Sequence, residues 1–214
     1  TRIEQVIDWS LGEGLVTILD FHGEDIQKEF VYTFDSVESS QYTHPNSAKR
    51  AADKEKFLAI WAQLATEFND HSENLLFEII NEPYFHMSSI DMNTLNTDVL
   101  AIIRGTGVNN STRNVIITGG GGIDLGDGGD DLDKTSYEVL DEIDDGIMSN
   151  DDHLIATFHY YKPFGFSSSS KGNFNTETWG TSGDKTAVKN HFIVVNTFST
   201  NHNNIPVFLG EFGA

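Results

Sequence analysis

The sequence of 214 residues contains no cysteine. This absence excludes disulfide bonds, thiolate nucleophiles and zinc sites built on thiolates. It does not indicate a cellular compartment, because a chain of this length can bury a sizeable core without cross-links. With 38% apolar residues and 15 phenylalanines, the composition is that of a globular domain.

Basic side chains are also scarce: 13 Lys and Arg stand against 33 Asp and Glu, which gives a formal charge of −20. A charge of this sign repels phosphate backbones and anionic lipids. It therefore argues against nucleic acid and membrane surfaces as partners and favours a neutral or cationic substrate. The simplest interpretation is an acidic surface that keeps the protein in solution.

Three sequence features with specific functions are missing. No apolar run approaches the ~18 residues that a transmembrane helix needs. The first residues, TRIEQVIDWS, do not have the basic start and apolar core of a signal peptide. No G-x-G-x-x-G or Walker loop follows the first expected strand, which argues against a nucleotide-binding sheet.

Two hydrophobic periodicities alternate along the chain. Continuous apolar runs predict five buried strands, at residues 16–21, 75–80, 114–118, 154–160 and 205–210. Apolar residues at helical spacing precede each of these runs, at residues 3–11, 57–68, 95–103, 137–147 and 188–198. Strands that are buried on both faces by crossover helices form a parallel sheet, so the predicted fold class is α/β.

Polar residues at the strand ends distinguish an open doubly wound sheet from an eight-stranded barrel. Ionisable or aromatic polar groups follow four of the five strands, and they are Asp20, His22, Asn81, Glu82, His159, Tyr161 and Glu211. In a barrel the carboxyl ends of all strands converge on one mouth, whereas in an open sheet they are spread along an edge. The pattern therefore favours a (β/α)8 TIM barrel.

Two glutamates are the strongest candidates for catalysis. Glu82 in NEPYF and Glu211 in LGEFGA each end an apolar strand. A salt-bridged helix cap is the structural alternative for either one alone. Two carboxylates that face one mouth, however, are the arrangement that cleaves a glycosidic bond, one as the acid and the other as the attacking group.

Four stretches of the chain resemble the family 5 glycoside hydrolases, the cellulase family of clan A. They are LDFHG (19–23), FEIINEP (77–83), ATFHYYKPFGF (156–166) and VFLGEFGA (207–214), and they occur in the family's order. The resemblance implies a TIM barrel with Glu82 as general acid/base and Glu211 as nucleophile. It also implies a retaining mechanism, with carboxyl groups ~5–5.5 Å apart.

The resemblance assigns further residues to substrate. Asn81 is similar to the amide that binds the sugar 2-hydroxyl, and His22 to a histidine that lines the subsite of the reacting sugar. His159 and Tyr161 match a His-x-Tyr pair, in which Tyr161 orients the nucleophile. From the residues alone, His22 also fits a core histidine, Tyr161 ordinary packing, and Trp179 either a sugar-stacking platform or a loop anchor.

The chain departs from the family in length. Five strands match the third through seventh strand units, whereas a complete barrel has eight strands and typically ~250 residues. The strand-2 arginine and strand-8 aromatic of the family have no counterpart here. We therefore expect residues 1–214 to be an internal fragment of a glycoside hydrolase catalytic domain. The parent is expected to be secreted, with its signal peptide outside this chain.

The resemblance predicts a monomeric endo-β-1,4-glucanase that acts on cellulose or a related β-glucan and needs no cofactor or metal. A mannanase or exo-glucanase of the same family is the nearest alternative. From another class, Asp20, His22, Glu24, Asp25 and His159 fit a metal-dependent hydrolase. A non-catalytic carbohydrate-binding barrel is the third hypothesis. The Gly- and Asp-rich segment 119–136 is interpreted as an acidic loop, with calcium binding as the alternative.

Overall fold

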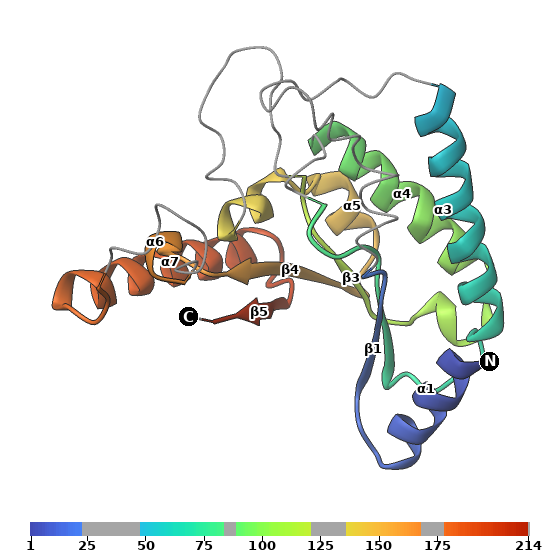
Figure 1. The fold of residues 1–214 in the computed structure, drawn as a ribbon. Helices are drawn as coiled ribbons and strands as arrows, with labels where there is room; N and C mark the ends of the chain where they lie inside the picture. The colour runs from blue at the N-terminus through green and yellow to red at the C-terminus, as the bar shows by residue number, and fades with distance from the viewer. Residues whose placement is uncertain (23–47, 84–88, 121–135, 168–177, 214) are drawn as a thin grey trace.

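The computed structural model describes residues 1–22, 48–83, 89–120, 136–167 and 178–213. Within these ranges five parallel strands form one sheet in the order β1-β2-β3-β4-β5 (Figure 1). The strands are β1 (Thr17–Asp20), β2 (Leu75–Glu78), β3 (Val115–Ile117), β4 (Leu154–Tyr160) and β5 (Val207–Phe212). Each overlaps a predicted strand, and spatial order equals chain order. The predicted α/β class and partial barrel are confirmed.

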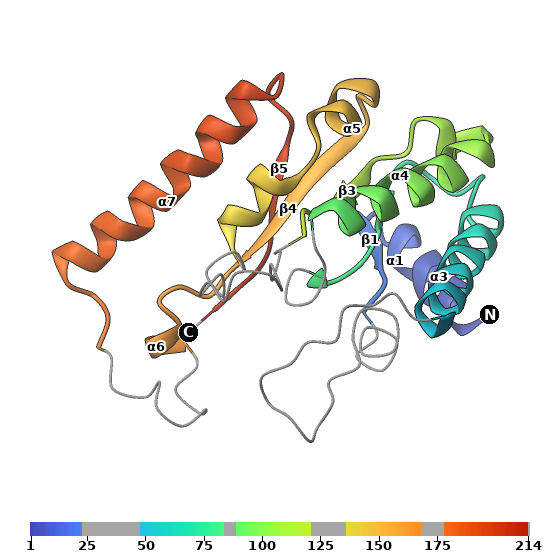
Figure 2. The same cartoon turned by 90° about the horizontal axis from the view of Figure 1, so that it is seen from above.

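Helices connect the strands and lie along the outer side of the curled sheet (Figure 2). They are α1 (Arg2–Gly12), α3 (Ala48–Glu67), α4 (Ser89–Gly105), α5 (Asp145–Asn150), α6 (Phe164–Ser167) and α7 (Ser182–Asn201), with 3-10 helices η2 (Val108–Ser111) and η4 (Tyr137–Glu142). Capping boxes begin α1 at Thr1 and α7 at Thr181. No helix within the described ranges is long and apolar enough to span a membrane.

The prediction of one continuous helix at residues 137–147 is wrong, because this segment forms two short helices instead. The 3-10 helix η4 ends at Glu142, and Ile143 is extended. Asp144 then begins α5, since its side chain accepts a hydrogen bond from the backbone N–H of Gly146. An Asp at this position satisfies a free backbone donor and so starts a new helix inside an otherwise continuous apolar pattern.

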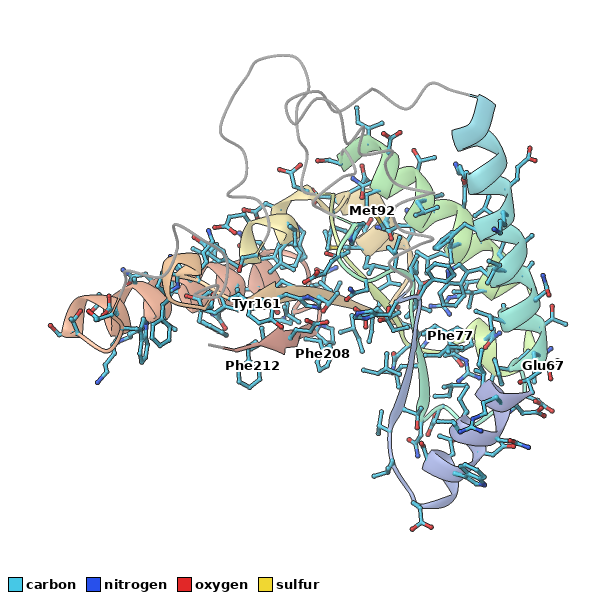
Figure 3. The ribbon with its side chains drawn as sticks, viewed as in Figure 1. Glu67, Phe77, Met92, Tyr161, Phe208 and Phe212 are labelled. Carbon is cyan, nitrogen blue, oxygen red and sulfur yellow. The ribbon has the colours of Figure 1, made fainter. Side chains whose placement is uncertain are left out.

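The core lies between the sheet and its helices. Trp61 of α3 is fully buried, and its Nε1–H donates to the carbonyl of Ile79 at 3.1 Å. Its ring packs on Phe77 of β2 with a centroid distance of 5.6 Å. In Figure 3, Phe77 lies on the helix-covered side of the sheet. Odd-numbered residues of β2 therefore face the helices, and Glu78 faces the inside of the curl.

The expectation that all strands are buried on both faces is wrong for the edge strands. The interior strands β2 and β3 are largely buried, but β1 and β5 are only partly so. Phe208 and Phe212 of β5 are 38% and 73% exposed and project from the free edge in Figure 3. In the described part of the chain no strand pairs with the outer edge of β1 or β5, so one flank of each remains open.

A buried arginine holds the amino-terminal ends of the strands together. Arg113, just before β3, is 1% exposed and donates hydrogen bonds to the side chain of Asn110 and to four backbone carbonyls, those of Phe68, His71, Ser72 and Leu75. Burial, followed by the charge of Arg104, lowers the pKa of Arg113 to about 10, so the guanidinium still carries its charge at neutral pH. This side chain joins the loop before β2 to the start of β3.

Replacing this arginine is expected to destabilise the protein strongly. Arg113→Leu removes the donor for four backbone carbonyls in a buried site, so the free energy of unfolding should fall by more than about 3 kcal/mol. Urea denaturation measures the change. The control is Arg2→Leu, on the exposed side of α1, where a change within about 0.5 kcal/mol is expected. A loss below about 1 kcal/mol for Arg113→Leu would contradict this structural role.

Candidate active site

Three strand ends bring Glu82, His159 and Glu211 into one cluster at the carboxyl edge of the sheet. A carboxylate oxygen of each glutamate and a ring nitrogen of His159 all lie within 4.8 Å of one another. His159 Nδ1 is 2.7 Å from Glu82 Oε1 and 3.7 Å from Glu211 Oε2. The histidine is almost fully buried, while the glutamate side chains are 27% and 35% exposed. The two carboxylates therefore share one accessible site with a buried imidazole between them.

A β-bulge at Gly210 sets the direction of Glu211. Along the β4–β5 pair, Phe158 is opposite Leu209 and His159 is opposite Glu211, so Gly210 has no partner. The extra residue turns Glu211 to the same side as His159. A Cβ at Gly210 would lie 2.9 Å from His159 Nε2 and 3.1 Å from Thr157 Oγ1. Only glycine leaves room for the imidazole against this strand.

Tyr161 holds the Glu211 carboxylate from the other direction. Its hydroxyl donates to Glu211 Oε2 at 2.9 Å. Burial, and then the hydrogen bond to Glu211 and the charges of both glutamates, raise the pKa of Tyr161 to about 12. The phenol therefore keeps its proton at working pH. One carboxylate oxygen of Glu211 is thus fixed by a permanent donor.

The electrostatics of His159 favour its charged form. Burial on its own lowers the pKa of the imidazole, but the hydrogen bond to Glu82 and the charges of Glu211, Glu82 and Glu78 outweigh it, so the pKa is raised. The backbone at His159 is also held, because the buried Ser136 hydroxyl donates to its carbonyl at 2.8 Å. Glu82 itself adopts φ = 43°, a left-handed conformation that is unusual for a side chain of this size.

His22 and Asn81 form the neighbouring part of the site. The Nδ1 atom of His22 is 2.8 Å from Asp20 Oδ2, and Nε2 is 3.4 Å from the amide nitrogen of Asn81. The backbone N–H of Asn81 donates to the carbonyl of Phe21 at 3.1 Å. The His22 side chain is 60% exposed, so the alternative of a core histidine is wrong.

Glu78 is a buried acid beneath the site that sequence reasoning missed. It is 8% exposed and lies opposite Asp20 in the β1–β2 register. Burial, followed by the charge of Asp20, raises the pKa of Glu78 to about 7. The sequence signal for it is an acidic residue inside the apolar run LLFEII, four residues before Glu82, where the pattern by itself predicts only a strand.

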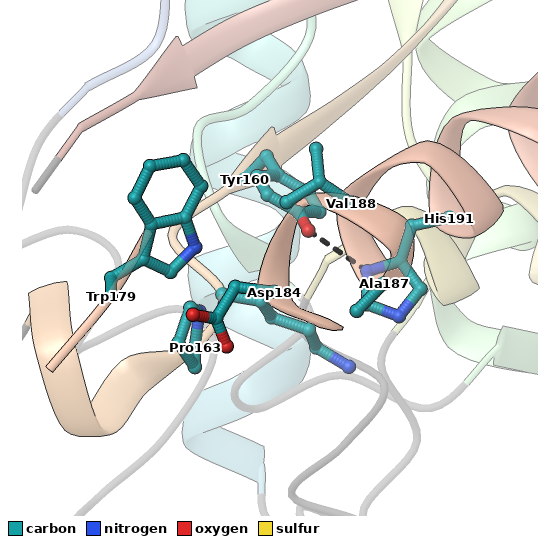
Figure 4. Close-up of a pocket in the computed structure, with 8 residues that line it drawn as sticks. Tyr160, Pro163, Trp179, Asp184, Ala187, Val188 and His191 are labelled. Carbon is teal, nitrogen blue, oxygen red and sulfur yellow. Dashed lines mark hydrogen bonds between the residues drawn. The ribbon is translucent and has the colours of Figure 1, made fainter. Parts of the chain in front are cut away.

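Trp179 lies apart from the carboxylates, in a separate cavity (Figure 4). This cavity has a volume of about 280 Å³ and lies between the end of β4 and helix α7. Its lining residues are Tyr160, Lys162, Pro163, Trp179, Asp184, Ala187, Val188 and His191. Trp179 is 43% exposed and packs near Phe166 at a ring-centroid distance of 6.3 Å. Neither Glu82 nor Glu211 lines this cavity.

The cluster of Glu82, His159 and Glu211 has the donor types of a metal site. The Nδ1 atom of His159, however, already contacts Glu82 at 2.7 Å, and Tyr161 donates to Glu211. Of the residues of the metal-hydrolase alternative, His22 contacts Asp20, whereas His159 contacts Glu82, which is not part of that set. Glu24 and Asp25 lie outside the described residues, as does most of segment 119–136.

A parallel α/β sheet with two carboxylates at its carboxyl edge is the arrangement of barrel glycosidases. The family model described as cellulase, glycosyl hydrolase family 5, matches residues 1–214. The chain belongs to this family.

Named relatives agree with this assignment. The chain is 38% identical over 211 residues to "Endoglucanase H" of Acetivibrio thermocellus, covering 99% of this chain and 19% of that protein. It is 26% identical to "Endoglucanase A" of Paenibacillus barcinonensis, covering all of this chain and 54% of that protein. The chain therefore spans between a fifth and about half of these relatives.

Solved structures show the same fold. The structure of endoglucanase Cel5A from Thermotoga maritima is similar with a TM-score of 0.75 and 25% identity, and the match covers 100% of this chain and 59% of that one. A tri-modular endo-beta-1,4-glucanase from Bacillus licheniformis, complexed with cellotetraose, matches with a TM-score of 0.74 and 28% identity, covering 100% of this chain and 35% of that one.

Removing the Glu82 charge is expected to lower the pKa of His159. In Glu82→Gln the imidazole loses its charged hydrogen-bond acceptor, while the desolvation by burial remains. NMR titration of the histidine ring measures the pKa in both proteins. The matched control is Asp145→Asn, which removes the carboxylate 3.0 Å from His202 instead. An unchanged pKa of His159 in Glu82→Gln would show that the 2.7 Å contact does not control its charge.

Proposed function

We propose that the protein is a retaining endo-β-1,4-glucanase that cleaves internal bonds of cellulose or a related β-glucan. The observation that carries this proposal is the approach of Glu82 and Glu211 within 4.8 Å around His159. Such proximity leaves no room for a water molecule in line between the second carboxylate and the sugar, and so favours covalent attack. Family membership and the names of the relatives support the choice of substrate.

In the proposed reaction Glu211 is the nucleophile. Its ionised oxygen attacks the anomeric carbon while the glycosidic C–O bond breaks, which gives a glycosyl-enzyme ester. The hydroxyl of Tyr161, at 2.9 Å, fixes one oxygen of this carboxylate. The charged form of His159, which the surrounding carboxylates favour, lies 3.7 Å from Glu211 and stabilises its negative charge.

Glu82 is the proposed acid and then base. The contact of 2.7 Å between Glu82 Oε1 and His159 Nδ1 holds one proton, which the charge of the ionised Glu211 favours, and Glu82 passes this proton to the leaving oxygen. Glu82 is ionised after it has given up this proton. Ester formation removes the negative charge of Glu211, and without that neighbouring charge Glu82 stays ionised. It can then accept a proton from the water that attacks the ester and releases the sugar with retained configuration.

Asn81 and His22 are proposed to bind the reacting sugar beside these two groups. Asn81 is 6% exposed and is held through its backbone and through His22. Trp179 is proposed as a more distant platform for the polymer, because an exposed indole face suits the apolar face of a pyranose ring. The acidic surface suits a neutral polysaccharide better than an anionic one.

We further propose that residues 1–214 are part of the catalytic domain of a secreted, monomeric enzyme. An insoluble or high-molecular-weight glucan cannot enter a cell, so its hydrolysis has to take place outside.

A mannanase or an exo-glucanase differs in the subsites around the same carboxylates. Assays on carboxymethyl-cellulose, barley glucan and mannan separate these specificities.

Amide replacement of either carboxylate is expected to remove activity. Glu82→Gln and Glu211→Gln should each lower kcat/KM on barley glucan by roughly 10³-fold or more, since each removes a group that changes bonds. The natural-length protein is assayed, with Glu138→Gln on η4 as the matched control, whose carboxylate pairs with Lys162. Full activity in either site variant would overturn the assignment.

Azide rescue separates the two roles. In Glu82→Ala, azide should attack the glycosyl-enzyme and give the β-glycosyl azide, because two displacements occur. In Glu211→Ala, azide should attack the substrate directly and give the α-azide by a single displacement. The reverse pairing would exchange the roles of the two glutamates.

Trp179 is expected to act on binding rather than on bond cleavage. Trp179→Ala should raise KM for a soluble polymer by about 10-fold with a smaller effect on kcat, because a stacking contact far from the carboxylates holds substrate and transition state equally. Trp9→Ala, which replaces a 66% exposed indole on α1, is the control. A fall in kcat with unchanged KM would contradict the platform role.

The rival classes give different results in the same assays. A metal-dependent hydrolase would lose activity on treatment with a chelator, whereas the two-carboxylate mechanism would not. A non-catalytic carbohydrate-binding barrel would bind glucan without turnover, and binding would survive replacement of both glutamates.

A further inference from the structure

Asp20 and Glu78 are neighbouring acids beneath the candidate active site. The two residues are paired in the parallel β1–β2 register, so their side chains leave the sheet on the same face. Phe77, which precedes Glu78 in β2, packs on Trp61 on the helix side. Asp20 and Glu78 therefore both point into the curl of the sheet, toward the carboxylate cluster.

The surroundings of the two acids contain little positive charge. The titratable groups that face Glu78 are Asp20 and His22 from the β1 side, His159 from β4 and Glu211 from β5. The residue opposite Glu78 on β3 is Ile116, which does not titrate. Within the described residues no lysine or arginine pairs with either acid.

One oxygen of Asp20 is buried without a partner. Asp20 Oδ2 contacts His22 Nδ1 at 2.8 Å, while Oδ1 is inaccessible and makes no hydrogen bond in the described part of the chain. A buried carboxylate oxygen without a donor is costly, and Glu78, the register partner of Asp20, would offer a donor if its carboxyl group were protonated. Two ionised carboxylates side by side in such a site would add mutual repulsion.

We propose that Asp20 and Glu78 form an acid pair that holds one proton between them, and that this proton keeps the Asp20–His22–Asn81 chain in the arrangement that presents Asn81 to substrate. Glu78 is a positioning residue in this proposal and does not touch the sugar. The role in catalysis rests on the proposed function, whereas the shared proton does not.

The directions of the pKa shifts agree with a shared proton. Burial raises the pKa of Glu78 to about 7, with the charge of Asp20 as the next cause. Burial also raises the pKa of Asp20, against the opposing effect of its hydrogen bond to His22. Because the two groups interact, the protons belong to the pair rather than to either residue.

The hydrogen-bonded chain explains how the proton acts at a distance. With one negative charge on the pair, Asp20 Oδ2 accepts from Nδ1–H of His22, and Nε2 of His22 lies 3.4 Å from the amide nitrogen of Asn81. Loss of the shared proton leaves Asp20 Oδ1 without a donor and places two negative charges side by side. Asp20 then moves away from Glu78, and the His22–Asn81 contact moves with it.

A carboxyl titration tests the shared proton directly. Carbon-13 NMR of the side-chain carboxyl groups should show one group in the natural protein that titrates near pH 7, and this group should be absent in Glu78→Gln. Glu138→Gln should leave it unchanged. Asp20→Asn provides a second variant, in which the remaining Glu78 should titrate at lower pH because a neighbouring charge is gone. The carboxyl group of the proposed acid Glu82 is assigned by its loss in Glu82→Gln and set aside. Among the remaining groups, the absence of any that titrates above about pH 6, or the survival of such a group in Glu78→Gln, would overturn the proposal.

The pH profile tests the positioning role. Ionisation of Glu78 contributes to the alkaline limb of kcat in the natural protein, whereas the side-chain amide introduced by Glu78→Gln keeps a donor at every pH. In Glu78→Gln we therefore expect near-normal kcat at about pH 6 and an alkaline limb moved up by about one pH unit. Glu78→Leu, which has no donor, should lose about 10-fold or more in kcat at all pH values, with folding checked by circular dichroism.

The outcomes are distinguishable from failure of the proposed function. An unchanged alkaline limb in Glu78→Gln, with activity present, would overturn the positioning role. A natural-length protein that hydrolyses no glucan would overturn the proposed function, while the carboxyl titration would still decide whether the proton is shared.

Discussion

The pairing of β4 with β5 is the constraint on which the site depends. A parallel ladder places His159 opposite Glu211, but only because Gly210 is bulged out of the register. Without the bulge, the alternation of side chains would turn Glu211 to the other face of the sheet. The close packing of His159 against the glycine backbone then fixes the imidazole between the two carboxylates.

Charge balance in the site follows from this geometry. The described residues facing the cluster carry four carboxyl groups, Asp20, Glu78, Glu82 and Glu211, with His22 and His159 as the facing bases. Since burial penalises every uncompensated charge, the site is stable only if some of these acids keep protons. The same requirement suits a mechanism in which one carboxyl group donates a proton while its neighbour is ionised.

Stability and function occupy opposite ends of the sheet. Arg113 and Arg104 join the loops at the amino-terminal ends of the strands through hydrogen bonds to backbone carbonyls. The carboxyl ends carry the titratable cluster, a left-handed Glu82 and the cavity of Trp179. This division is typical of barrels, whose strand ends on one side carry the chemistry and on the other the structural contacts.

The α/β class, the five strands and the residues at their carboxyl ends follow from the amino-acid pattern alone, because buried strands and amphipathic helices have distinct periodicities. The same pattern also marks Glu82 and Glu211 by their position after apolar runs. The neighbours of each site residue, in contrast, depend on contacts between strands and helices that are distant in the chain. The role of Gly210 depends on the register of β5 against β4, and Glu78 becomes notable only when Asp20 lies next to it. Trp179 lines a cavity beside α7 that neither Glu82 nor Glu211 lines. Such contacts join residues far apart in sequence, and no local pattern encodes them.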